Sequence, residues 1–172
     1  MGVQMTFVRT KKIKGNEYAY IVENKWKKRG NKVKQKTKKY LGRVYRFDRV
    51  NVMDFYEHYD ISDVDEYLKQ NSKDKIILDL IKLGLFNYGF EEKDGKFVRE
   101  NCFFDGKRFF SRRGKIALAF NEGFLSDFTL KRVLNFKADV EEDGAIFAKY
   151  FVESGLAVPQ DVFVGIFSKI FK

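Results

Sequence analysis

Residues 17–41 place chemically similar side chains at every second position, a spacing that is typical of β-strands. Residues 3–13, 17–27 and 32–41 are the three expected strands, and Gly42 is expected to end the third. Turn residues separate them, first Gly15-Asn16 and then Arg29-Gly30-Asn31. Because both connections are short, we expect an antiparallel three-stranded meander.

The second and third expected strands each have one distinctive face. In the second strand the even positions hold Tyr18, Tyr20, Val22 and Trp26. In the third strand the even positions hold Lys32, Lys34, Lys36 and Lys38, so these four lysines should project from one face. Val33 and Leu41 should then lie on the opposite face.

Charge is divided unevenly along the chain. The net charge is +10, yet residues 1–50 alone hold 16 basic and three acidic residues, which gives +13. Residues 51–172 hold 18 basic and 21 acidic residues and are therefore close to neutral. Such asymmetry indicates a polyanionic partner for the basic part. We expect a basic β-meander module in residues 1–50 and a second domain in residues 62–172.

The remainder of the chain mixes β-hairpins with helices, which predicts an α+β fold. Asp94-Gly95 and Asp105-Gly106 are hairpin dipeptides within the expected β-region, residues 88–120. The expected helix caps are Ser62 and Asp63, then Asp74, and then Ser126. Gly84 is expected to end the helix that Asp74 caps. The expected helices are 52–59, 64–70, 75–83, 127–136, 141–154 and 160–171.

The basic segment is suited to nucleic acid, because lysine and arginine neutralise phosphates and release condensed counterions. An alternative is that the lysine row is a solvated face or a strand edge protected against aggregation. For Tyr18, Tyr20 and Trp26, core packing is favoured over base stacking. The candidate nucleic-acid contacts of this segment are Arg9, Lys11, Lys12, Lys14, Tyr20, Trp26, Lys28, Arg29, Lys32, Lys34, Lys36, Lys38 and Arg43.

Residues 8–44 resemble the short basic N-terminal segment of some DDE-type insertion-sequence transposases. The resemblance lies in a basic strand, a Tyr-rich strand and a Gly turn, followed by Lys32-Val33-Lys34-Gln35 and Lys39-Tyr40-Leu41-Gly42. It implies a DNA-contacting accessory module. The catalytic part of those enzymes, an RNase H-like domain with three carboxylates, does not carry over, so a freestanding or repurposed module is expected.

Two later segments also invite a nucleic-acid interpretation. Residues 103–115 interleave aromatic residues with four further candidate contacts, Lys107, Arg108, Arg112 and Arg113. A hairpin with buried phenylalanines and solvated arginines is the favoured interpretation. The last two expected helices form a helix–turn–helix-like pair, but the final one is apolar where a recognition helix should be basic or polar. Core packing, a homodimer or a protein partner is expected there.

Several classes are disfavoured by composition. One His and one Cys make a His/Cys zinc site implausible, and no cofactor is expected. Cys102 lies in an apolar β-segment, where an inert buried thiol is expected rather than a nucleophile. No apolar run approaches the roughly 20 residues of a membrane helix, and no signal peptide is evident. A cytoplasmic location is expected.

The sequence therefore predicts a non-enzymatic nucleic-acid-binding protein that contacts phosphates through a basic β-sheet, with DNA favoured over RNA. One alternative is a metal-dependent nuclease or recombination-related enzyme, which requires converging carboxylates. Another is a structural partner protein in a ribonucleoprotein or multiprotein assembly.

Overall fold

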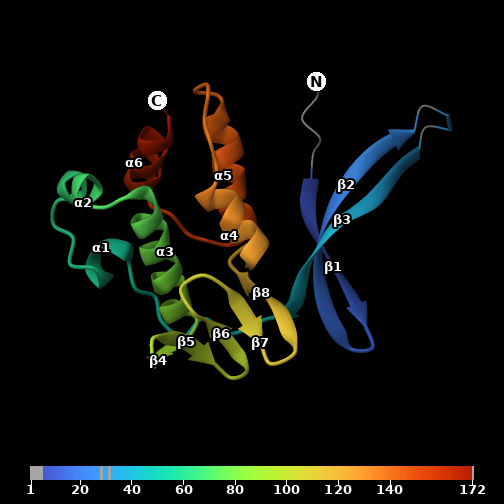
Figure 1. Cartoon of the computed structure of the whole chain (residues 1–172), viewed down its shortest axis with the longest axis horizontal. Coiled ribbons are helices and arrows are strands. Elements are labelled where there is room, and N and C mark those ends of the chain that lie inside the picture. Colours follow the sequence, from blue (N-terminus) through green and yellow to red (C-terminus); the bar gives the residue numbers. More distant parts are fainter. Residues whose placement is uncertain (1–5, 28, 31, 172) are drawn as a thin grey trace.

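The structure is a computed structural model that describes residues 6–27, 29–30 and 32–171. It has the expected α+β fold, with an N-terminal β-meander, further hairpins and C-terminal helices (Figure 1). The meander consists of β1 (Thr6–Ile13), β2 (Asn16–Lys27) and β3 (Lys32–Tyr45), paired antiparallel. Within the described residues, all three expected strands are therefore confirmed.

Strand β3 is longer than expected, because Gly42 does not end it. At Gly42 the backbone has a φ of +148°, and β3 passes against the backbone of Ile116. A Cβ atom on Gly42 would lie 2.7 Å from the N, Cα and C atoms of Ile116. The glycine thus permits a close approach between two strands, and the chain continues to Tyr45 in the sheet.

This close approach joins the meander to the rest of the sheet. Strand β3 pairs in parallel with β8 (Gly114–Phe120), beginning with Arg43 opposite Ile116. The full order of strands is β1-β2-β3-β8-β7-β6-β5-β4, with β9 also paired to β8. The remaining strands are β4 (Glu91–Lys93), β5 (Lys96–Arg99), β6 (Cys102–Phe104), β7 (Phe109–Ser111) and β9 (Gly123–Leu125).

Two register shifts change which side chains of β3 share a face. The pairing with β2 skips Lys38 between Ile21 and Val22, and skips Leu41 between Ala19 and Tyr20. Each extra residue is a β-bulge, which resets the alternation of side chains. Leu41 therefore packs in a core cluster with Ala19 and Ile21. The expectation that Leu41 would lie opposite the lysine row was wrong for this reason.

The described chain has six helices, and the first four of them begin at a side-chain cap. Asp63 caps α2 and Ser126 caps α4, as expected. The third helix begins after Ser72 rather than Asp74, and it continues through Gly84, where an added Cβ atom would lie 3.8 Å from the ring of Phe120. The helices are α1 (Phe55–His58), α2 (Val64–Gln70), α3 (Lys73–Asn87), α4 (Asp127–Leu134), α5 (Asp143–Ser154) and α6 (Gln160–Ile170).

The buried side chains form two clusters. The larger one lies between the helices and the hairpin sheet and is rich in phenylalanine. The smaller one consists of Ala19, Ile21, Leu41, Val44 and Ala117, with Phe128 of α4 packed against it. It fastens one face of the meander to β8 and α4, which fixes where the rest of the meander points.

We predict that Gly42→Ala destabilises the protein by about 3 kcal/mol, since it combines an unfavourable φ with an overlap against Ile116. Urea unfolding measures the loss. Gly15→Ala is the matched control, because Gly15 also has a positive φ, +79°, but has nothing within 4 Å of its added Cβ. It should cost about 1 kcal/mol. Equal losses in the two variants would contradict the close approach.

Candidate nucleic-acid interface

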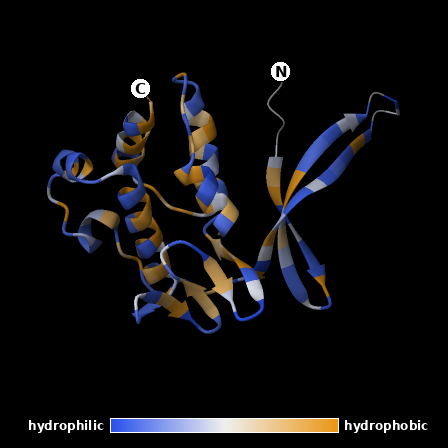
Figure 2. Cartoon of the chain, viewed as in Figure 1, coloured by the Kyte–Doolittle hydropathy of each residue, from blue (hydrophilic) through white to orange (hydrophobic). Residues whose placement is uncertain are grey.

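The outer ends of β2 and β3 project from the body as a two-stranded ribbon. Strand β1 begins at Thr6, which pairs with Glu23, so the described pairs beyond Glu23 involve β2 and β3 alone. We call residues 24–27 and 32–35 the β-arm. Figure 1 shows it extending away from the helices, and Figure 2 shows that it is mainly hydrophilic.

Register places a row of lysines on one face of this ribbon. Lys25 lies opposite Lys34, and Lys27 lies opposite Lys32, so two pairs of like charges face each other directly. Lys36 lies opposite Glu23. Together with the two lysines at the bulge, they form what we call the lysine face. Its members are Lys25, Lys27, Lys32, Lys34, Lys36, Lys38 and Lys39.

The bulge in β3 brings Lys38 and Lys39 to the same side of the sheet. The Lys38 ammonium lies 2.9 Å from a carboxylate oxygen of Glu23. The Lys39 ammonium lies 4.8 Å from the ring centroid of Phe128, which packs on the core side of the meander. Sequence reasoning found Lys38 but missed Lys25 and Lys39, because their positions depend on strand register and on the bulge.

Glu23 is the one carboxylate that the register of β2 and β3 places among these lysines in the described chain. Its residue is 0% exposed, and its Oε1 atom has no hydrogen-bond partner among the described residues. This single buried acid, which pairs with Lys38, cannot balance the charge of the seven lysines of the face. The lysine face is therefore strongly cationic, and it favours anions.

The opposite face of the meander carries the tyrosines. Tyr18, Tyr20 and Tyr40 line a shallow hollow of about 310 Å³ together with Ile13. In the described chain, Tyr18 and Tyr20 belong to neither core cluster, and Trp26 is 62% exposed opposite Val33. The expectation of core packing was wrong for these three aromatic residues, because neither core cluster extends to their part of the meander.

Three of the candidate cations belong to this tyrosine face. The register puts Arg9 opposite Tyr20, Lys11 opposite Tyr18 and Arg43 opposite Tyr18 on the other side. Arg9 donates a hydrogen bond to the Gln35 side chain, and Lys11 lies 5.3 Å from the Tyr20 ring centroid. The candidate contacts that the sequence treats as one set therefore divide between two faces of the same sheet.

The other candidate contacts of the meander lie in its turns or beside them. Lys12 is exposed near the end of β1, and Lys14 is in the β1–β2 turn with a φ of 49°. Arg29 is exposed in the turn at the tip of the β-arm. Lys28 lies outside the described residues.

The second basic segment forms exposed hairpin turns on the body, away from the tip of the β-arm (Figure 1). The Asp105 carboxylate accepts hydrogen bonds from the backbone N–H groups of Lys107 and Arg108, at 2.9 and 2.7 Å. Phe109 is 1% exposed and stacks on Phe104 at 4.4 Å. The turn and the buried Phe109 agree with the hairpin interpretation. The side chains of Arg112 and Arg113 are exposed in the next turn.

A basic groove continues from the base of the lysine face onto the helices. It has a volume of about 460 Å³. Lys39 lies on one side, and the other lining residues come from α4, α5 and the loop between them. These are Phe128, Lys131, Arg132, Asn135, Phe136, Lys137 and Tyr150. The lysine face and the groove thus share Lys39.

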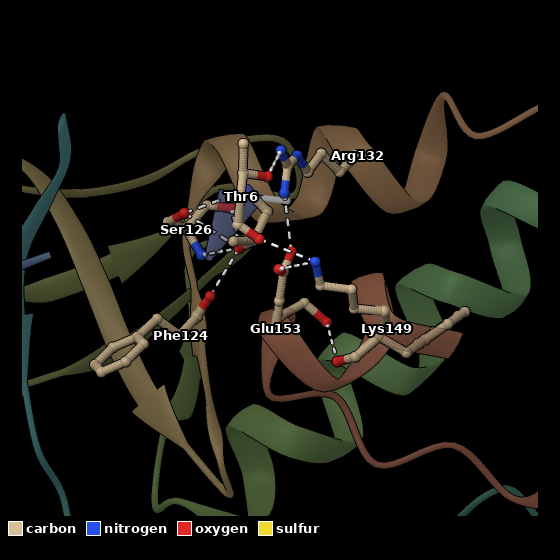
Figure 3. Close-up of polar contacts among 9 residues, drawn as sticks. Thr6, Phe124, Ser126, Arg132, Lys149 and Glu153 are labelled. Atoms are coloured by element: carbon tan, nitrogen blue, oxygen red, sulfur yellow. Dashed lines mark hydrogen bonds and ion pairs between the residues drawn. The ribbon is translucent and has the colours of Figure 1, made fainter. Parts of the chain in front are cut away.

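Arg132 lines this groove and also holds β1 against the helices through Thr6 (Figure 3). It donates hydrogen bonds to the Glu153 carboxylate and to the Thr6 hydroxyl, both at 2.9 Å. Its guanidinium carbon lies 4.8 Å from the ring centroids of both Phe128 and Tyr150. Lys149 donates to the Thr6 carbonyl at 2.9 Å. Arg132 is therefore committed to structure, whereas Lys39 and Lys131 border open space.

The other residues considered as functional candidates, Cys102 and the apolar positions of α6, are packed in the core. Cys102 is 0% exposed, and burial raises the pKa of its thiol to about 12, as expected for an inert thiol. Val162 and Ile166 of α6 are buried in the larger core, as its apolar pattern predicts. Within the described ranges, no three His, Cys, Asp or Glu side chains gather closely enough to hold a metal ion. None of the described helices is long and apolar enough to cross a membrane.

Comparison of the chain with models of known protein families, with curated proteins and with solved structures finds no match. The transposase resemblance of residues 8–44 therefore stays a prediction.

We predict that Lys34→Glu slows amide hydrogen exchange in the β-arm, because it turns the repulsive pair with Lys25 into an attractive one. The expected gain in local stability is about 0.2–1 kcal/mol. Hydrogen exchange followed by NMR measures it residue by residue.

Lys36→Glu makes the same change of charge but places a second carboxylate opposite the buried Glu23. It should speed exchange at the base of the β-arm. If both variants change exchange in the same direction, the register assigned to the lysine face is wrong.

Proposed function

We propose that this chain is a non-enzymatic nucleic-acid-binding protein that contacts phosphates through the lysine face, with DNA favoured over RNA. The observation that carries the proposal is the direct opposition of Lys25 to Lys34 and of Lys27 to Lys32 on a projecting ribbon. Like charges at opposed positions destabilise a strand pair. A short two-stranded ribbon has little other stabilisation to offset that repulsion.

A polyanion would relieve the repulsion and so explain the arrangement. Phosphates carry a dense negative charge, and each lysine that neutralises one releases condensed counterions into solution. Lysines on a strand edge that serve only solubility need not be paired directly with lysines of the neighbouring strand. The opposed pairs therefore favour a phosphate-rich partner over a merely solvated face.

The shape of the β-arm also fits a duplex. The major groove of B-DNA is about 12 Å wide and admits a two-stranded β-ribbon. Within the described residues, the β-arm pairs only with itself beyond Glu23, so it keeps the width of a two-stranded ribbon there. Lys39 and Lys131 continue the basic surface toward the groove on α4, where a neighbouring phosphate backbone could be held.

The test is a salt titration of duplex DNA binding, measured by fluorescence anisotropy on the full chain. The double variant Lys32→Gln/Lys34→Gln should bind more weakly than wild type. The slope of log affinity against log salt concentration should fall by about 2, since each phosphate contact contributes about 0.9.

The matched control is Lys69→Gln/Lys93→Gln, which removes the same charge from exposed lysines on α2 and β4. Its slope should equal that of wild type. If both double variants lower the slope equally, binding depends on net charge and not on the lysine face. If wild type shows no affinity for duplex DNA or RNA at low salt, the proposed function is wrong.

A further inference from the structure

We propose that the tyrosine face is a second binding site, which takes unpaired bases of single-stranded DNA by stacking. The face is defined by Tyr18, Tyr20 and Tyr40, with Arg9, Lys11 and Arg43 around them. The proposal rests on the proposed function for the class of partner. It concerns the face of the sheet opposite the lysine face.

The tyrosines form an open aromatic surface. The ring centroids of Tyr20 and Tyr40 are 5.3 Å apart, and those of Tyr18 and Tyr40 are 6.4 Å apart. Tyr40 is 40% exposed, and the hollow that the three rings line with Ile13 is shallow and open. Its volume of about 310 Å³ lies at the lower end of the range of small-ligand sites, about 300–1,000 Å³.

These aromatic rings expose apolar surface to water, although the opposite face of the same strands packs in the smaller core cluster. Ala19 and Ile21 alternate with the tyrosines along β2 and fill the smaller core cluster. Packing therefore does not require aromatic side chains at positions 18, 20 and 40. Aromatic residues grouped on an exposed face mark binding sites more often than aromatic residues scattered singly.

The charge of this face selects an anionic partner. Arg9, Lys11 and Arg43 lie beside the rings, and the register places no carboxylate on this face among the described residues of β1, β2 and β3. Burial is the main cause that raises the pKa of Tyr40, so its hydroxyl stays neutral at physiological pH. A partner bound to this face would contact basic side chains and the faces of aromatic rings at the same time.

Single-stranded DNA combines those two features, whereas duplex DNA does not. In a duplex the faces of the bases are stacked inside and cannot reach an open sheet. Unpaired bases stack on aromatic side chains of β-sheet binders, while basic side chains follow the backbone. The proposed preference for DNA on the lysine face makes single-stranded DNA the occupant to which we commit.

The test compares two probes on the full chain, a labelled oligothymidylate of about 12 nucleotides and a duplex of the same length. Tyr18→Leu/Tyr40→Leu should weaken binding of the oligothymidylate by about tenfold or more, because base stacking on each ring is lost. It should leave duplex binding within about twofold of wild type. Tyr18→Phe/Tyr40→Phe keeps both rings and should bind the oligothymidylate as wild type does.

A second measurement needs no variant. On addition of oligothymidylate to wild-type protein, the NMR signals of the Tyr18 and Tyr40 ring protons should move upfield, as stacked rings require. Unmoved ring signals, or undiminished oligothymidylate binding by the leucine variant, would overturn the inference. Tighter binding of oligouridylate would overturn the assignment to DNA. If wild-type protein binds the duplex but not oligothymidylate, this inference alone is wrong. If it binds neither probe, the proposed function is wrong as well.

Discussion

The pairing of β3 with β8 at Gly42 is the constraint on which the rest of the structure depends. It is a parallel pairing, so the chain between the two strands must return through a long connection, here α1 to α3 and the hairpin strands β4 to β7. Gly42 allows the two strands to approach. Ala19, Ile21 and Leu41 of the meander pack with Ala117 of β8 in the smaller core cluster and stabilise the same region. With this end fixed, the far end of β2 and β3 is left to project.

The two faces of the meander follow from that attachment. Near Gly42, the face that packs on α4 carries small and aliphatic side chains. Further out, the same face leaves the body and carries lysines, with Lys39 at the border. The opposite face meets the larger core at Tyr45, and further along it the tyrosines at positions 18, 20 and 40 lie beside cations. One sheet therefore offers a cationic surface and an aromatic surface, each with its own chemistry.

Local patterns predicted the strands and most helices, but not the features that depend on distant contacts. Alternation and turn residues located β1 to β3, and Asp63 and Ser126 located two helix starts. The prediction that Gly42 ends its strand was wrong, because the role of Gly42 depends on Ile116, which is 74 residues away in the sequence. The opposition of Lys25 to Lys34 could not be predicted without the strand register. The position of Lys39 depends on a β-bulge for which the local sequence gives no signal.

The central claim is that the lysine face is where nucleic acid binds. NMR titration of the labelled full chain with a short DNA duplex tests it most directly, because it maps the contact residue by residue. Backbone amide signals of the β-arm and of Lys36 to Lys39 should shift, while those of Lys107 to Arg113 stay in place. Shifts confined to the 107–113 turns, or no shifts at low salt, would contradict the claim.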